Sequence, residues 1–141
     1  MAVVSKPSIF TGSSIFIGAE DNEFLTNPSL SLCGHFGSGQ PKVNASLLHN
    51  GDVIEGFTVY HTPGHTRGSI CLYRENTLIS GDTVFPFGSY GRADLPTGND
   101  EEMRLSLQRL NELTVESLWC GHGEPLVSGA QKHLQQSLKN V

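Results

Sequence analysis

Three side chains that can bind a metal ion each follow an apolar, strand-like run of this sequence. His65 lies just after a run that Pro63-Gly64 interrupts, Asp82 lies at the end of a second run, and His122 follows a third inside the sequence GHG. Neutral imidazole and carboxylate are ligands that Zn²⁺ and similar divalent ions accept, and one carboxylate can bridge two ions. Taken singly, each residue is more often a turn former, a helix cap or a surface residue. The repeated placement at strand ends is what favours a metal site.

Strands must carry these side chains to one place. Runs of apolar and β-branched residues predict short strands at 14–17, 45–48, 52–54, 57–61, 69–73, 77–80 and 114–120. Helical segments alternate with these strands, so the pattern predicts a layered α/β or α+β domain. The irregular segment FPFGSYGRADLPTGND that comes soon after Asp82 is typical of a functional loop.

The clearest helix signal follows this loop. A helix begins at Asp100 with Asn99 as its cap, because acidic residues favour the positive N-terminal end of a helix. Met103 and Leu110 recur on what we expect to be its inward face. Further helical turns are expected at 1–7, at 20–25 up to Asn27-Pro28, and in a last helix that Ser128 caps.

Length and composition restrict the class of protein. A chain of 141 residues suits one domain, spanning 1–141, with a single core. The net charge of −5 argues against nucleic acid or an anionic membrane as the main partner. No run approaches the ~20 apolar residues that span a bilayer, and the first residues lack a signal-peptide core. The three cysteines are widely spaced without a CxxC pair, which favours reduced thiols and a cytoplasmic location over a disulfide framework.

Three short motifs link the sequence to a known family. The segments TPGHT (62–66), SGD (80–82) and GHG (121–123) resemble the third, fourth and fifth motifs of the metallo-β-lactamase superfamily. The loop GSYGRADLPTGN (88–99) is most similar to the glyoxalase-II-like, or hydroxyacylglutathione hydrolase-like, branch. The resemblance runs from about Ile15 to near Gly129. It implies a metallo-β-lactamase αββα sandwich with the metals at one edge, between its sheets.

The resemblance also implies roles for individual residues. His65 would be a ligand of a first zinc ion, Asp82 would bridge two zinc ions, and His122 would be a ligand of the second. In the family the metals lower the pKa of bound water, and the hydroxide attacks a carbonyl, typically of a thioester such as a hydroxyacyl-glutathione. Arg92 and Asp94 are candidates for supporting the ligands. An ion pair that braces the loop is an equally good account of those two residues.

The first motif of the family, HxHxDH, is absent from this sequence. The residues before Ile15 resemble the helix that follows that motif, so we expect the N-terminal part of the sandwich, with one sheet and the remaining ligands, to be missing. Cys33-Gly34-His35 is a weak substitute pair. His65, Asp82 and His122 by themselves would hold zinc weakly, and we expect little hydrolase activity from the chain alone.

A missing sheet would leave apolar strand faces uncovered. The residues concerned are Ile15, Val59, Ile70 and Ile79, and their exposure predicts self-association or association with a separate N-terminal half. Two alternatives to a zinc hydrolase stay open. One is a non-catalytic remnant of the family. The other is an iron-dependent relative such as the persulfide dioxygenase branch, which has similar TPGHT and GRTD-like segments.

Overall fold

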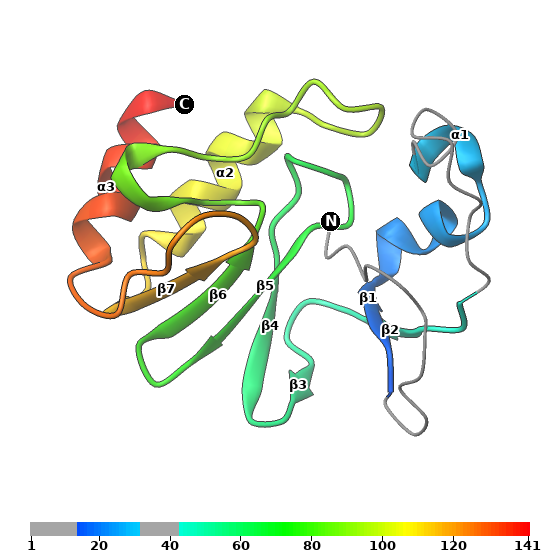
Figure 1. The fold of residues 1–141 in the computed structure, drawn as a ribbon, viewed down its shortest axis with the longest axis horizontal. Helices are drawn as coiled ribbons and strands as arrows, with labels where there is room; N and C mark the ends of the chain where they lie inside the picture. The colour runs from blue at the N-terminus through cyan, green and yellow to red at the C-terminus, as the bar shows by residue number, and fades with distance from the viewer. Residues whose placement is uncertain (1–13, 32–42) are drawn as a thin grey trace.

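A five-stranded sheet is the centre of the structure. The computed structural model describes residues 14–31 and 43–141 of the chain. In the main sheet the strands follow the order β3-β4-β5-β6-β7 (Figure 1). They are β3 (Val53–Ile54), β4 (Phe57–His61), β5 (Ile70–Arg74), β6 (Thr77–Gly81) and β7 (Ser117–Cys120). Two further strands, β1 (Phe16–Gly18) and β2 (Ser46–Leu48), pair in parallel as a small separate sheet.

The directions of the strands bring three of their ends to one edge. β3, β4, β5 and β6 pair antiparallel in sequence, whereas β7 pairs parallel with β6. Consequently β4, β6 and β7 all run the same way. A parallel neighbour needs a crossover connection, and the chain between β6 and β7 supplies one with a helix. The C-terminal ends of β4, β6 and β7 therefore lie at the same edge of the sheet.

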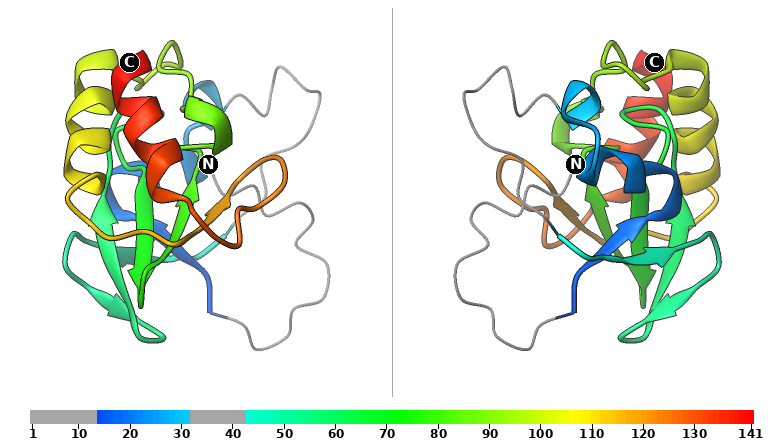
Figure 2. Two further views of the ribbon diagram at one scale, coloured as in Figure 1. Left: turned by 90° about the vertical axis from the view of Figure 1, so that its left-hand side faces the viewer. Right: turned by 90° about the vertical axis from the view of Figure 1, so that its right-hand side faces the viewer.

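Two helices cover one face of this sheet. α2 (Asp100–Leu110) and α3 (Gln131–Asn140) pack on the same side, as the two side views show (Figure 2). Leu78 of β6 and Leu118 of β7 point toward the helices and are fully buried. The core between sheet and helices consists of Cys71, Leu78, Val84, Met103, Leu107, Leu110, Val115, Leu118, Ala130 and Leu134.

Short helical turns connect the remaining parts. η1 (Ala19–Leu25) follows β1, α1 (Pro28–Ser31) comes next, and η3 (Pro86–Gly88) lies in the loop after β6. β1 lies against the segment that joins β4 to β5, because a Cβ added at Gly18 would be 2.0 Å from the carbonyl oxygen of Gly68. The N-terminal part of the described chain is thus fixed to the segment that carries His65.

Most of the predicted elements are present, and the prediction at Asn99 is confirmed. Its side-chain oxygen accepts a hydrogen bond from the backbone N–H of Glu102 at 2.9 Å, as an N-cap should. The predicted cap at Ser128 is wrong, because α3 begins only at Gln131. Gly129 has a φ of 65°, so the chain turns there before a helix can start. The helical turn predicted at 1–7 lies outside the described residues.

The helical segment predicted to end at Asn27-Pro28 is followed by a second turn instead. α1 begins at Pro28 itself, and the side chain of Asn27 accepts the backbone N–H of Ser29 at 3.1 Å. Proline suits the first position of a helix because its fixed φ is already helical and its missing N–H has no helical partner there. Asn27-Pro28 therefore starts a helical turn as well as ending one.

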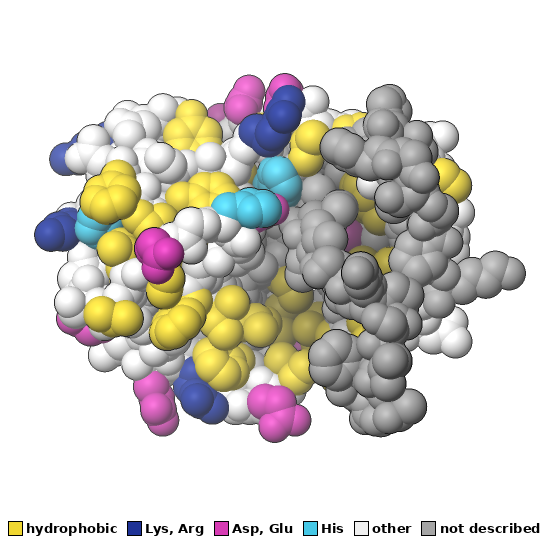
Figure 3. Space-filling view, viewed as in Figure 1, with side chains coloured by type: hydrophobic (Ala, Val, Ile, Leu, Met, Phe, Trp, Pro, Cys, Tyr) yellow, Lys and Arg dark blue, Asp and Glu magenta, His cyan; other side chains and the backbone are white. Residues whose placement is uncertain are grey.

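The face of the sheet opposite to α2 and α3 is partly uncovered. Ile79 of β6 and Trp119 of β7 are cross-strand neighbours on this face, and 37% and 48% of their surfaces are exposed. Figure 3 shows hydrophobic side chains gathered there. The expectation that Val59 lacks cover is wrong, since Val59 is only 1% exposed. Ile70 is half-buried and lies close to Gly18, so β1 covers part of this face. Within the described ranges, the structure contains no helix of the length and apolarity that crossing a membrane requires.

Candidate metal centre

His65, Asp82 and His122 come together at the edge where β4, β6 and β7 end. Asp82 directly follows β6, whereas His65 and His122 lie in the turns that follow β4 and β7. The Nε2 atom of His65 is 3.5 Å from Oδ2 of Asp82, and Nε2 of His122 is 3.5 Å from Oδ1. The side chains of His65 and Asp82 are almost buried, but that of His122 is 76% exposed. The carboxylate of Asp82 therefore lies between two imidazoles, with one oxygen facing each.

A close backbone approach holds Asp82 in this position. A Cβ atom added at Gly121 would be 2.2 Å from Oδ1 of Asp82, a separation that real Cβ atoms do not show. The backbone N–H of Gly121 also donates to the carbonyl oxygen of Gly81 at 2.7 Å. The turn before His122 can lie against the carboxylate only because residue 121 has no side chain. This is the structural reason for the glycine in the GHG segment.

One hydrogen bond sets the orientation and the tautomer of His65. Its Nδ1 atom is 2.8 Å from the carbonyl oxygen of Arg92, and a carbonyl can only accept. In the neutral imidazole the proton is therefore on Nδ1, and Nε2 keeps its lone pair toward Asp82. In a histidine that binds a metal through one ring nitrogen, the other ring nitrogen usually donates its N–H to a group such as a backbone carbonyl.

Arg92 and Asp94 pair with each other through their side chains, and Arg92 contacts His65 through its backbone. Their side chains form a bidentate ion pair, with both N···O distances at 2.6 Å, and each side chain is 66% exposed. The hydrogen bond from Arg92 lowers the pKa of the Asp94 carboxyl. It is the main-chain carbonyl of Arg92, not its guanidinium, that contacts His65. Sequence reasoning could not find this contact, because a backbone carbonyl is present whatever the residue type.

The donors fit a metal ion on each side of Asp82, but only in part. Two ligands of a tetrahedral zinc ion lie about 3.4 Å apart when each is ~2.1 Å from the metal. Both imidazole–carboxylate distances are close to this value, at 3.5 Å. Each side has two donors, one nitrogen and one oxygen. Within residues 14–31 and 43–141, no group of three or more His, Cys, Asp or Glu side chains is arranged to hold one ion.

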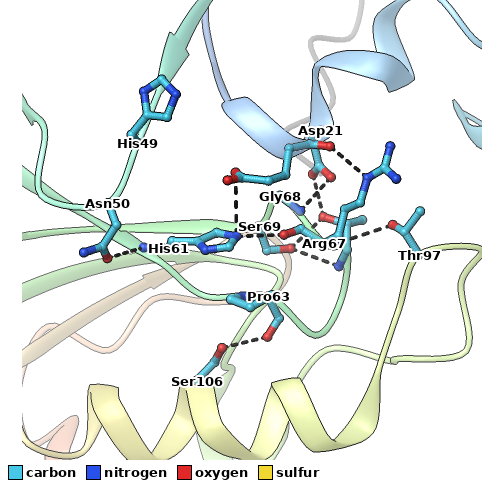
Figure 4. Close-up of polar contacts among 12 residues, drawn as sticks. Asp21, His49, Asn50, His61, Pro63, Arg67, Gly68, Ser69, Thr97 and Ser106 are labelled. Atoms are coloured by element: carbon cyan, nitrogen blue, oxygen red, sulfur yellow. Dashed lines mark hydrogen bonds and ion pairs between the residues drawn. The ribbon is translucent and has the colours of Figure 1, made fainter.

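The other described imidazoles are bound to different partners. His61, the last residue of β4, has its Nε2 atom 2.7 Å from the carbonyl oxygen of Arg67 (Figure 4). His133 accepts the backbone N–H of Phe87 through Nδ1 at 2.9 Å. His49 lies 3.6 Å from Asp52 on an exposed turn. The substitute pair Cys33 and His35 lies outside the described residues.

One residue of the N-terminal segment escaped the sequence-based prediction. Asp21 of η1 accepts hydrogen bonds from the segment between β4 and β5 that carries His65 (Figure 4). In sequence, Asp21 sits in the acidic run Glu20 to Glu23, which is explained sufficiently by the start of a helical turn. No local signal distinguishes it from its acidic neighbours.

The chain is similar in sequence to a known protein family and to individual relatives. The family model described as "Metallo-beta-lactamase superfamily" matches residues 12–122. The "Probable metallo-hydrolase MJ0888" of Methanocaldococcus jannaschii is 48% identical over 73 residues, which are 49% of this chain and 35% of that protein. A "Hydroxyacylglutathione hydrolase" of Salmonella paratyphi A is 39% identical over 85 residues, which are 57% of this chain and 33% of that protein.

Solved structures show the same fold. The crystal structure of TTHA1623 in a di-iron-bound form superposes with a TM-score of 0.69 and 26% identity, over 90% of this chain and 62% of that one. The chain thus spans about a third of the two curated relatives and less than two thirds of this structure. The match of the family model covers most of the sequence, including His65, Asp82 and His122. The chain belongs to the metallo-β-lactamase superfamily and has its mixed α/β fold.

Proposed function

We propose that this chain carries part of the active site of a metal-dependent hydrolase that acts on a thioester such as a hydroxyacyl-glutathione. The observation that supports it most is the position of Asp82, with one carboxylate oxygen 3.5 Å from His65 and the other 3.5 Å from His122. The names of the two curated relatives, one a probable metallo-hydrolase and the other a hydroxyacylglutathione hydrolase, support the same class.

Each residue has a definite part in this proposal. His65 and Asp82 would hold one divalent ion, and Asp82 and His122 would hold a second. Ions bound there would lower the pKa of a water molecule and polarise a substrate carbonyl. The carbonyl of Arg92 keeps Nε2 of His65 directed toward Asp82. The high exposure of His122 leaves that side of the centre open to a small-molecule substrate.

The complete active unit is proposed to be the αββα sandwich, to which this chain contributes a sheet with its helices. Each ion would receive two donors from the described residues, whereas a catalytic zinc ion normally has three protein ligands. We therefore propose that the chain alone has little activity. The partners of this unit would be the thioester substrate and a second polypeptide surface, from another copy or from an N-terminal half. A cytoplasmic location stays a prediction from the cysteine content.

Metal binding tests the assignment directly. We expect the purified chain to bind zinc or iron weakly in a titration, and Asp82→Ala to lose most of that binding, because the substitution removes a donor from both ions. Asp94→Ala is the matched control, since it removes an exposed carboxylate on the same edge of the molecule. Equal metal affinity in wild type and Asp82→Ala would contradict the proposal and favour a non-catalytic remnant.

Activity and metal identity separate the remaining alternatives. With Zn²⁺ and a hydroxyacyl-glutathione, we expect the chain alone to show little turnover. Robust turnover that Asp82→Ala abolishes would show that the chain suffices as an enzyme. Iron is the specific second candidate because TTHA1623 is described in a di-iron-bound form. Iron in place of zinc, together with oxygen consumption on a glutathione persulfide, would assign the chain to a dioxygenase instead.

A further inference from the structure

The carboxylate of Asp21 binds the segment between β4 and β5 through both of its oxygens. Oδ1 accepts the backbone N–H of Gly68 at 2.8 Å, and Oδ2 accepts the hydroxyl of Thr66 at 2.5 Å. Asp21 belongs to η1 and lies more than 40 positions away from these partners in the sequence. The contact is therefore tertiary, and it joins the N-terminal part of the chain to residues next to His65.

Hydrogen-bond donors and acceptors in this contact are fixed by chemistry. Thr66 gives its hydroxyl proton to Asp21, because an ionised carboxylate can only accept. Ser69 then gives its own hydroxyl proton to Oγ1 of Thr66, 2.8 Å away. The same Ser69 oxygen accepts the backbone N–H of Thr66 at 3.0 Å. Hydrogen bonds therefore run in one direction, from the Ser69 hydroxyl to the Thr66 hydroxyl and from there to the Asp21 carboxylate.

The backbones approach closely at this point as well. A Cβ atom at Gly68 would lie 2.2 Å from the backbone nitrogen of Asp21 and 2.6 Å from its Cγ atom. Thr66 itself is only 2% exposed. A buried contact of this kind strengthens hydrogen bonds and penalises any that are lost. His65 is the residue directly before Thr66, so its backbone is held from this side by Asp21.

From this geometry we propose that Asp21 is a positioning residue for His65. Acting through Thr66 and Gly68, it holds the backbone at a place where Nδ1 of His65 can donate to the carbonyl of Arg92 while Nε2 faces Asp82. The consequence for metal binding rests on the proposed function; the consequence for the His65 ring does not. A simple brace for η1 would instead affect only the stability of the fold.

The test measures the ring nitrogens of His65 by ¹⁵N NMR at pH 8. We expect the wild type to show one tautomer, with the proton on Nδ1. In Asp21→Asn, either the Thr66 hydroxyl or the Gly68 N–H must face the amide NH₂ group instead of an acceptor. The backbone at His65 is then held less firmly, so His65 should show a mixture of tautomers. Thr66→Val, which removes the hydroxyl, should have the same effect. Thr66→Ser, which keeps the hydroxyl, should show the single tautomer of the wild type.

Glu23→Gln is the matched control within η1. Glu23 forms an ion pair with Arg67, so its substitution removes an equal charge and a neighbouring contact but leaves the bonds of Asp21 in place. We expect Glu23→Gln to keep the wild-type His65 signals. Unchanged His65 signals in folded Asp21→Asn, or an equal disturbance by Glu23→Gln, would overturn the proposal. The comparison remains valid even where Asp21→Asn lowers the stability of the fold. Thr66→Val and Thr66→Ser test the same hydrogen bond from its other side.

A zinc titration separates this proposal from the proposed function. With the hydrolase assignment correct, Asp21→Asn should weaken zinc binding by about 10- to 100-fold, the range seen when residues that orient a ligand are removed. Absence of zinc binding in the wild type would count against the hydrolase assignment, whereas the NMR comparison would still decide the role of Asp21. Wild-type affinity in Asp21→Asn would show that the ring is held without it.

Discussion

At the scale of single residues, a carboxylate and two imidazoles form the candidate metal centre. Asp82 faces His65 with one oxygen and His122 with the other. The carbonyl of Arg92 and the bare Cα of Gly121 keep this arrangement in place, one by a hydrogen bond and the other by leaving room. Small changes beside Asp82 should therefore alter metal binding more than they alter folding.

Gly121→Ala is predicted to weaken zinc binding by about 10- to 100-fold, as loss of a ligand's orientation does. The new methyl group would overlap Oδ1 of Asp82, so the carboxylate must turn away. Gly123→Ala is the control in the same turn, because a Cβ atom there meets nothing within 4 Å although φ is 84°. It should cost about 1–2 kcal/mol of stability from backbone strain and keep zinc affinity. Equal zinc affinities in the two variants would contradict the role of Gly121.

The buried thiol of Cys71 should make the free energy of unfolding fall at high pH. Burial raises the pKa of its thiol from 9.0 to about 11, against hydrogen bonds that lower it. Between these values the unfolded chain has released the proton and the folded chain has kept it. The folded state thus binds more protons there, so the free energy of unfolding falls as pH rises, by about 2–3 kcal/mol in all. Urea unfolding at pH 8 and pH 10.5 should show a steeper fall for wild type than for Cys71→Ala. An equal fall in the free energy of unfolding for wild type and Cys71→Ala would contradict this role of Cys71.

At the scale of elements, α2 holds the sheet and the metal-site loops together through one buried face. Leu107 is fully buried in the core, whereas Leu105, two residues earlier on the same helix, is 46% exposed. Ser106 also donates its hydroxyl proton to the carbonyl of Pro63 at 2.7 Å, just before His65 (Figure 4). The helix therefore supports both the core and the turn that carries His65.

Substitutions on α2 should separate according to face. Leu107→Ala is predicted to lower the free energy of unfolding by about 2–5 kcal/mol, because it leaves a cavity between helix and sheet. Leu105→Ala should change it by only about 0.5 kcal/mol, as is usual at an exposed position. Chemical denaturation monitored by the fluorescence of Trp119 measures both. Similar losses in the two variants would mean that α2 does not pack as described.

Prediction of these elements from sequence succeeded where one local signal decides. β4 has the predicted bounds, and Asn99 caps α2 as expected, because the capping partner lies three residues away. The start of α3 was missed, since Ser128 is a good cap by type and only the left-handed backbone at Gly129 prevents it. Local residue preferences describe what a segment can do, and the tertiary structure selects among those possibilities.

At the scale of the whole molecule, the uncovered face of the sheet is the main open feature. Ile79 and Trp119 pair across β6 and β7 on the side away from α2 and α3. Both strands end at the candidate metal centre, in Gly81 and Cys120. A surface that covers this face would therefore also reach the edge where the two ions would have only part of their ligands.

Self-association is predicted to depend on this face. We expect sedimentation equilibrium to show the wild-type chain as a reversible oligomer, and Trp119→Gln to shift it toward the monomer by removing apolar contact area. Leu105→Gln is the matched control, because Leu105 has nearly the same exposure on the opposite side of the molecule and the net charge is again unchanged. An effect of Leu105→Gln equal to that of Trp119→Gln would place the interface elsewhere.

The sequence by itself predicted three candidate metal-binding side chains and the strands that end beside them, and it determined the family to which the chain belongs. These follow from residue type and local order, which short motifs and apolar runs record directly. Only the tertiary structure decided that β4, β6 and β7 run in the same direction, so that His65, Asp82 and His122 meet at one edge. It also decided the contacts of Asp21 and of the Arg92 carbonyl, because bonds between distant segments depend on the path of the backbone and leave no local signal.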